Sequence, residues 1–178
     1  MSTRPAATAA LLTSLLLLLP LVAAAAQEPV AIAITAYGTY TSKLQSKDPT
    51  DTAVTGFINR VTDVKLIEQT DKLCARLGLD FGLDYLVHGT TAGVRPGAPV
   101  ELQMVTRFPA PGIVDPQGRR FATSTYTQQT SIGGTGYRSY TFEYAWEIVA
   151  GEWVFEFHHR GRKIAEQRFT VATACGIS

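Results

Sequence analysis

Residues 79–87 read LDFGLDYLV, and this segment decides the fold class. Its odd positions are apolar and most of its even positions are polar or small, which is the two-residue period of a strand with one buried face. The same alternation recurs over residues 100–108 (VELQMVTRF), 140–148 (YTFEYAWEI) and 153–157 (WVFEF). All four segments are rich in β-branched and aromatic residues, which strands favour. We therefore predict a half-buried strand at each of them.

Weaker strand patterns complete the set. Residues 30–40, 61–68 and 164–171 are apolar with partial alternation, and the threonine-rich residues 119–130 predict an exposed or edge strand. The polar residues 42–55 predict a long surface loop, and only residues 71–77 look helical. The chain therefore contains about eight predicted strands.

Glycine and proline separate these strands. Residues 115–118 (DPQG) carry Pro and Gly at the second and fourth positions of a β-turn. Residues 133–136 (GGTG) suit a flexible hairpin loop, and residues 150–151 and 160–162 join the last strands. Residues 109–112 (PAPG) form a stiff connection that is suited to carrying the chain between sheets. This spacing predicts an all-β fold, an immunoglobulin-like antiparallel β-sandwich of about eight strands, with a small closed barrel as the alternative.

Residues 1–26 have the organisation of a signal peptide. Arg4 gives a charged start, residues 6–22 are apolar or small with leucine at every position from 15 to 19, and three alanines over residues 24–26 form a cleavage pattern. The apolar stretch is shorter than the roughly 20 residues of a membrane span, which favours cleavage over anchoring. We predict a single domain over residues 27–178, beginning at Gln27, in the periplasm or secreted.

Charge narrows the range of partners. The full chain has 16 basic and 15 acidic residues, and loss of Arg4 leaves 15 of each. A neutral chain without basic clusters argues against nucleic acid, because phosphate contacts need Lys and Arg. It also gives no reason to expect binding to an anionic membrane surface.

The two cysteines, Cys74 and Cys175, predict a disulfide, because exported proteins meet an oxidising compartment. Such a bridge would fasten the C-terminal tail. Two separate thiols are the alternative. A redox-active role is disfavoured, since no Cys-x-x-Cys spacing occurs.

The three histidines do not form a metal-binding pattern. His158 and His159 are neighbours on a predicted strand, so they point to opposite faces, with His159 on the core side. His88 ends another strand. Because zinc or copper needs three or four converging ligands, we predict no metal and no cofactor.

The acidic pairs and nucleophile motifs do not predict an enzyme. Asp80 and Asp84 share one strand face, as do Glu143 and Glu147, but the alternation places both pairs on solvated outer faces. There is no Gly-x-Ser-x-Gly and no Ser-x-x-Lys. Residues 133–136 are no phosphate cradle, because a strand and not a helix follows them.

The aromatic residues divide into two groups. Six lie in phase on the predicted strands and suit a sandwich core better than a sugar-binding platform: Phe142, Tyr144, Trp146, Trp153, Phe155 and Phe157. The other group, Tyr37, Tyr40, Tyr126 and Tyr137, lies near strand ends or loops, so it is the predicted ligand surface.

Three segments carry a resemblance to a known family. They are residues 82–85 (GLDY), the connection over residues 109–112, and a closing hairpin made of residues 151–157 (GEWVFEF) and 163–171 (KIAEQRFTV). On these segments the chain resembles the bacterial family called domain of unknown function 3859, over about residues 30–171. The resemblance implies an immunoglobulin-like sandwich and supplies no established activity and no catalytic residues.

Three functional hypotheses follow. The leading one is an exported, non-enzymatic envelope protein that binds another protein or a glycan, or is structural, without a membrane anchor after cleavage. The alternative is a secreted carbohydrate-active or other hydrolytic enzyme that uses carboxylates such as Asp84 and Glu143. A weaker hypothesis is metal handling through His88 and His159.

Overall fold

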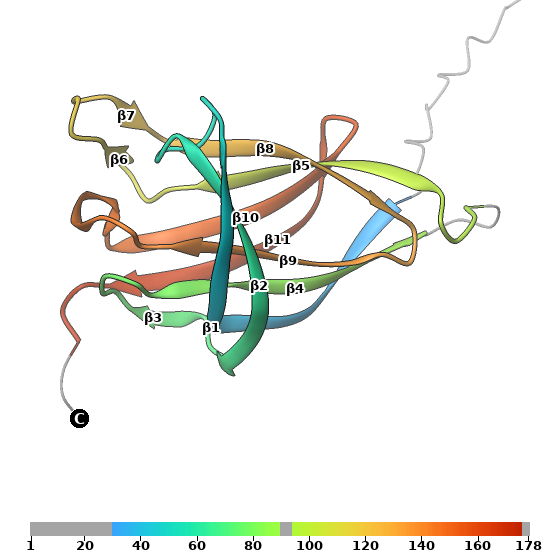
Figure 1. The fold of residues 1–178 in the computed structure, drawn as a ribbon, viewed down its shortest axis with the longest axis horizontal. Helices are drawn as coiled ribbons and strands as arrows, with labels where there is room; N and C mark the ends of the chain where they lie inside the picture. The colour runs from blue at the N-terminus through green and yellow to red at the C-terminus, as the bar shows by residue number, and fades with distance from the viewer. Residues whose placement is uncertain (1–29, 90–93, 176–178) are drawn as a thin grey trace, which may run out of the picture.

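The computed structural model describes residues 30–89 and 94–175. The predicted signal peptide over residues 1–26 and the start at Gln27 lie outside this range. The described residues are nearly all in strands, which form two packed sheets and a small hairpin (Figure 1). Among these residues, no helix is long and apolar enough to cross a bilayer. The predicted fold class, an immunoglobulin-like all-β sandwich, is confirmed.

The first sheet has the strand order β2-β1-β4-β9, and its paired strands are antiparallel. These strands are β1 (Val30–Pro49), β2 (Phe57–Glu68), β4 (Asp80–Gly89) and β9 (Thr135–Thr141). The segment over residues 79–87 supplies the inner strand β4, whose odd positions from 81 to 87 are all at most 3 % exposed. Its alternation therefore marks the buried face correctly.

The second sheet has the order β3-β11-β10-β5-β8. It contains β3 (Lys72–Cys74), β5 (Pro99–Arg107), β8 (Thr123–Ser131), β10 (Gly151–His159) and β11 (Arg162–Ala172). All pairs are antiparallel except β3 with β11, which is parallel. Threonine-rich β8 lies at an edge, as predicted, and β6 (Ile113–Val114) pairs with β7 (Arg120–Phe121) beside the sheet.

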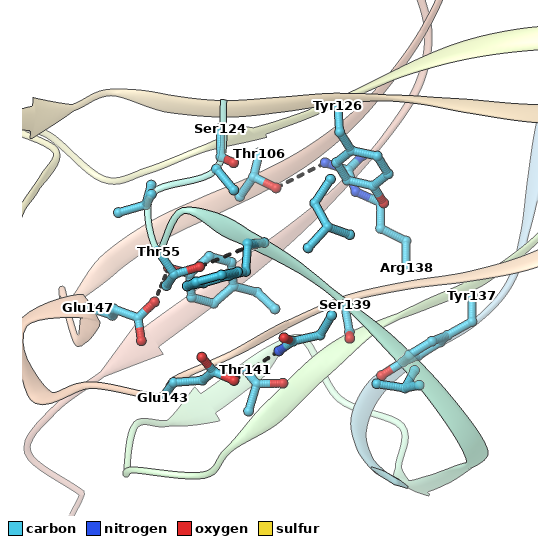
Figure 2. A pocket seen from close by; sticks show the side chains of 17 residues that line it. Thr55, Thr106, Ser124, Tyr126, Tyr137, Arg138, Ser139, Thr141, Glu143 and Glu147 are labelled. Carbon is cyan, nitrogen blue, oxygen red and sulfur yellow. Dashed lines mark hydrogen bonds between the residues drawn. The ribbon is translucent and has the colours of Figure 1, made fainter. Parts of the chain in front are cut away.

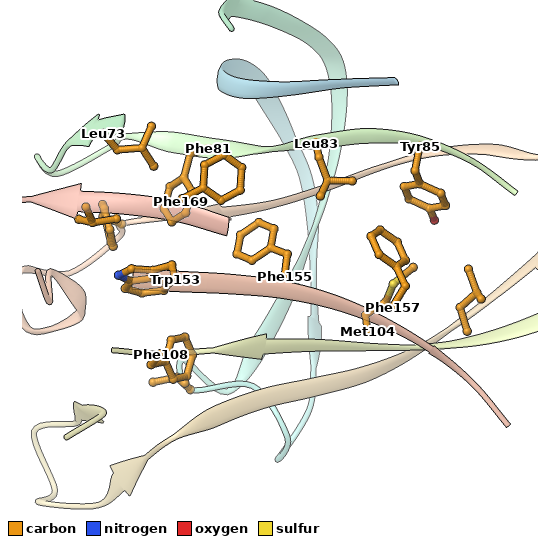
Figure 3. Packing of buried hydrophobic residues seen from close by; sticks show 14 of the residues in the cluster. Leu73, Phe81, Leu83, Tyr85, Met104, Phe108, Trp153, Phe155, Phe157 and Phe169 are labelled. Carbon is orange, nitrogen blue, oxygen red and sulfur yellow. The ribbon is translucent and has the colours of Figure 1, made fainter. Parts of the chain in front are cut away.

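Aromatic rings from both sheets fill the space between the layers (Figure 3). Phe81 of the first sheet packs edge-on against Trp153 of the second at 5.6 Å between ring centroids, and it stacks on Phe155 at the same distance. Tyr85 packs against Phe157 at 4.9 Å. Offset and edge-to-face contacts of this kind add to the stabilisation from burial. The in-phase aromatics of β10 are core residues, as predicted.

Two predicted turns are present. Gly118 donates its backbone N–H to the carbonyl oxygen of Asp115 at 2.9 Å, which closes the four-residue DPQG turn. Arg160 and Gly161 both have positive φ, 50° and 77°, as a two-residue hairpin turn between β10 and β11 requires.

Two predictions between residues 42 and 77 are wrong. Residues 42–49 belong to β1 and pair with β2, so no long loop spans residues 42–55. Their alternation is weak because both faces of this hairpin are largely exposed. Residues 71–77 form no helix, because Lys72–Cys74 is a strand whose Leu73 is buried against the core.

The predicted strand over residues 140–148 is also wrong. Strand β9 begins at Thr135 and ends at Thr141, and a short 3-10 helix, η1 (Ala145–Glu147), follows. Phe142 is buried, but Tyr144 is 45 % exposed and stacks on the half-buried Trp146. The apolar period arises here from a short helix that happens to follow the strand. The connection over residues 109–112 leads from β5 of the second sheet to β6 of the small two-stranded sheet, and the chain returns to the second sheet at β8, so it does not join the two packed sheets.

One hairpin extends beyond the sandwich, and we call it the arm: residues 41–68, which comprise the second half of β1, the turn and β2. In Figure 1 the arm crosses the strands of the first sheet and its tip reaches β8. There the backbone N–H of Thr125 and the hydroxyl of Ser124 donate to the carbonyl oxygen of Thr52 at 3.3 and 3.2 Å. The arm therefore bridges the two sheets on their open side.

Candidate functional site

A pocket of about 150 Å³ lies beneath the arm (Figure 2). It opens where β9, an edge of the first sheet, faces β8, an edge of the second. Its lining consists of residues 53–55, 57–59 and 61 of the arm, Thr106, Ser124 and Tyr126 of the second sheet, residues 137–141 of β9, Glu143 and Glu147. Polar side chains from both sheets and the arm thus meet in one cavity.

Arg138 is the buried cation of this pocket. The side chain comes from β9 and is 2 % exposed. Its guanidinium donates to the carbonyl oxygen of Glu156 at 2.6 Å and to the hydroxyl of Thr106 at 3.0 Å. The group also lies 4.9 Å and 5.4 Å from the ring centroids of Phe155 and Phe157. Burial lowers the pKa of Arg138, but a guanidinium is not deprotonated in proteins, so the charge stays.

Arg138 has no carboxylate within ion-pair distance among residues 30–89 and 94–175. The Glu156 side chain is occupied elsewhere, by Arg107 at 2.7 Å and by His158 at 2.8 Å. Burial alone would raise the pKa of Glu156, but these hydrogen bonds and the charges of Arg107 and Lys163 lower it to about 2. Arg138 therefore has no direct ion-pair partner among the described residues, and the Glu156 carboxylate acts on its charge only from a distance.

Glu147 contradicts the prediction of a solvated acidic pair. It is fully buried, and its two carboxylate oxygens accept hydrogen bonds from the Tyr140 hydroxyl at 2.6 Å and the Tyr144 backbone N–H at 2.7 Å. Burial raises the pKa of Glu147, and the hydrogen bonds only partly oppose this. The sequence pattern failed here because residue 147 lies in η1, which turns the side chain inward.

Glu143 lines the same end of the pocket and is already paired. Lys47 donates to its two oxygens at 3.0 and 2.8 Å, and the Asn59 amide donates at 3.0 Å. These contacts fasten the arm to the segment after β9. Both acids of the pocket are therefore hydrogen-bonded by neighbouring residues of the chain.

Asp80 is also buried, against the prediction that Asp80 and Asp84 are solvated. The Asp80 carboxylate accepts from the Tyr137 hydroxyl at 3.1 Å and from Ser42 at 2.9 Å, while half-buried Asp84 accepts from Tyr40 at 3.2 Å. The arm covers this outer face of β4, which is why the alternation misplaced the acids.

Tyr40 and Tyr137 pack against each other, and each reaches the aspartate that is the strand partner of the other. Tyr40 pairs with Asp80 in the strand register but reaches Asp84, and Tyr137 pairs with Asp84 but reaches Asp80, with ring centroids 4.8 Å apart. A Cβ atom on Gly82 would lie 2.7 Å from the Ser139 side chain and 2.1 Å from a backbone oxygen. A glycine is therefore required where the GLDY segment meets β9.

The four tyrosines of the predicted ligand surface lie in different places. Tyr126 and Tyr137 line the pocket, Tyr40 is buried under the arm, and half-buried Tyr37 packs against the core. Their role in binding stays a prediction. Arg138 was not predicted as a site residue. The pattern that could have identified it is a charged side chain at an inward-facing strand position between Gly136 and Tyr140.

The histidines do not converge. His159 is buried with its Nδ1 3.0 Å from the carbonyl oxygen of Glu101, as its inward phase predicted, while His158 pairs with Glu156 and His88 is exposed. In the described ranges, no group of three or more His, Cys, Asp or Glu side chains is placed to hold a metal ion.

The predicted disulfide joins Cys74 to Cys175, which are 101 residues apart in sequence. Cys74 ends β3, the short parallel edge strand, and Cys175 follows β11, to which β3 is paired. The bridge therefore fastens the edge of the second sheet opposite the pocket.

Comparison with known proteins places the chain in a family. A solved immunoglobulin-like protein of Pseudomonas aeruginosa is similar at 26 % identity with a TM-score of 0.54, over 83 % of this chain and 99 % of that one. No curated protein matches the sequence significantly. The model of a domain of unknown function (DUF3859) matches residues 29–171. The chain therefore belongs to the DUF3859 family, with the immunoglobulin-like fold that its strands predict.

Proposed function

We propose that this protein is an exported, non-enzymatic binding module of the bacterial envelope, and that its ligand or partner enters the pocket beneath the arm. The observation that carries the proposal is the convergence of polar side chains from two sheets and the arm on one cavity. Such convergence of a few polar groups in a partly apolar cavity is typical of binding sites.

Occupied acids favour binding over catalysis. Glu147 is sealed from solvent, and Glu143 is paired with Lys47 and Asn59. The alternative, hydrolysis by a carboxylate pair, draws on the fact that both acids line one pocket. It requires an acid that reaches the substrate. Hydrolysis of a glycan or ester that is abolished by Glu143→Gln with unchanged folding would favour the enzyme.

Export is supported by two independent features. Residues 1–26 have the pattern of a signal peptide, and disulfides persist in oxidising compartments. Intact-mass analysis of protein from the native envelope fraction, with alkylation before and after reduction, tests this directly. We expect a mass that begins at Gln27 and no alkylated thiol until reduction. A mass that retains Met1 with two free thiols would contradict export.

Binding at the pocket is tested by site-specific crosslinking in cells. A photoreactive amino acid replaces Phe57, which is 40 % exposed and lines the pocket. The matched control replaces Leu77, which is 58 % exposed and lies between β3 and β4. We expect a discrete adduct from position 57 and none from position 77. Equal labelling from both positions, or none from position 57, would contradict a binding site beneath the arm.

A further inference from the structure

The pocket holds a charge that its own residues do not balance. Arg138 is 2 % exposed, and the described residues place no carboxylate within ion-pair distance of it. An isolated buried charge is unfavourable unless a partner compensates it. The guanidinium carries five N–H donors, and the described residues accept from two of its nitrogens. Donor capacity therefore remains for a ligand.

We propose that the pocket beneath the arm binds the carboxylate of a small monocarboxylate group, with the Arg138 guanidinium as its ion-pair partner. The inference rests on the proposed function, because it names the chemistry of the ligand that the same pocket takes.

The Arg138 guanidinium is preorganised to bind such a ligand. Phe155 and Phe157 lie against it, and the Glu156 carbonyl and the Thr106 hydroxyl fix it by hydrogen bonds. Its position is therefore set before any ligand binds, which limits the entropy lost on association. A planar guanidinium matches a carboxylate by paired N–H···O bonds.

Tyr126 supplies a second donor beside Arg138 (Figure 2). Its hydroxyl makes no hydrogen bond to a described residue, and burial raises the pKa of Tyr126, so the hydroxyl stays protonated. An anion on Arg138 would accept a hydrogen bond from it. Arg138 and Tyr126 together form a polar end of the pocket with room for one charged group.

The rest of the lining limits the ligand to a single negative charge. Arg138 is the one Lys or Arg among the described residues that line the pocket, so a phosphate with two charges would lack a second cationic partner there. Val54, Ile58 and Val61 of the arm form an apolar wall, which suits a short alkyl chain. A cavity of about 150 Å³ has room for a short alkyl chain.

Butyrate, butyramide and inorganic phosphate are the probes, added to the mature disulfide-bonded protein in a buffer without carboxylates. ¹H–¹⁵N NMR follows the Arg138 Nε–H signal. We expect a saturable shift with butyrate and at least tenfold weaker binding of butyramide, because the amide cannot form the ion pair. A shift of equal size with butyramide, tighter binding of phosphate, or no shift at all would overturn the proposal.

Variants assign the binding to Arg138. With binding followed through the backbone amide signals of the pocket, since Arg138→Met lacks the Nε–H, this variant should bind butyrate at least tenfold more weakly, whereas the exposed control Arg76→Met should stay within twofold of the wild type. If Arg138→Met does not fold, Tyr126→Phe takes its place, with an expected loss of about threefold. Unchanged affinity in the folded variant that is tested would overturn the assignment.

Two sources of the carboxylate are separated by peptides. Trialanine with a free C-terminus and its C-terminal amide are compared with butyrate. Tighter binding of the free acid than of butyrate would support a chain terminus of a protein partner, and tighter binding of butyrate would support a small molecule. An adduct from position 57 in cells without butyrate binding would overturn this inference and leave the proposed function intact.

Discussion

Glu156 makes polar contacts on both faces of the second sheet, one through its backbone carbonyl oxygen and one through its carboxylate. Its carbonyl oxygen accepts from Arg138 between the sheets, and its carboxylate pairs with Arg107 on the outer face. The residue occupies β10, a strand with neighbours on both sides, so the carboxylate is only 5 % exposed. Its ion pairs must offset the desolvation of a buried charge. Acid should therefore weaken the fold at this residue.

We predict that Glu156→Gln removes part of the acid sensitivity of the protein. The pKa of Glu156 falls to about 2 in the fold, so the stabilisation is present above its ordinary pKa and is lost as pH falls toward 2. Because Arg107 is half-exposed, we expect a contribution of about 1–2 kcal/mol at pH 7. Urea unfolding at pH 7 and pH 3 measures it. The exposed control Glu68→Gln should lose as much free energy of unfolding between pH 7 and pH 3 as the wild type does. The prediction is wrong if Glu156→Gln also loses that amount.

At the scale of elements, the arm is the hairpin that extends beyond the two packed sheets. Its two strands pair with each other, and its tip and base contact the sandwich through Thr52, Lys47 and Asn59. Few apolar side chains of the arm are buried, with Val54 the exception at 4 % exposure. Elements held by few buried contacts open locally at low free energy. We therefore expect the arm to open locally more easily than the packed sheets do.

We predict that Glu143→Ala loosens the arm without unfolding the sandwich. The change removes the acceptor for both Lys47 and Asn59. Exposed ion pairs contribute about 0–1 kcal/mol, so the free energy of unfolding should fall by no more than about that amount. Hydrogen exchange of the amides of residues 57–61 should accelerate several-fold, whereas Glu152→Ala on the second sheet should leave them unchanged. Unaltered exchange in Glu143→Ala would show that other contacts hold the arm.

For the whole molecule, the disulfide and the arm act at opposite edges of the sandwich. The second sheet has β3 at one edge and β8 at the other, and the bridge ties β3 while the arm reaches β8. Strand β3 pairs with β11 through only three residues. A cross-link that closes a loop of about 100 residues removes much of the freedom of the unfolded chain.

We predict that the double variant Cys74→Ser, Cys175→Ser lowers the free energy of unfolding by about 2–4 kcal/mol and keeps the fold. The size reflects the long closed loop, and the fold survives because both cysteines are exposed and neither belongs to the buried core. Urea titration of the variant, beside the wild type with and without reductant, measures the effect. Equal midpoints for all three samples would contradict it, because the bridge would then contribute nothing to stability.

Prediction from sequence succeeded where a strand has one face in the core. The alternation of β4 and β10 reports burial directly, so residues 81–87 and the aromatics of β10 were placed correctly. The alternation failed to identify residues 42–49, because this paired strand has both faces largely exposed. It also failed for residues 142–148, because a short 3-10 helix there produces the same two-residue apolar period as a strand. Periodicity measures one-sided burial and carries little information where burial is absent or comes from a different element.

The sequence by itself determined the all-β sandwich, its core strands, the family and the cysteine pair, because these depend on local periodicity, on matching segments and on residue counts. The tertiary structure alone decided the site. Arg138, Thr106 and Tyr126 belong to three strands of two sheets, and only packing brings them together. Asp80 is buried because the arm covers it, and Glu147 is buried because η1 turns its side chain inward. Such burial depends on long-range contacts, which no local pattern records.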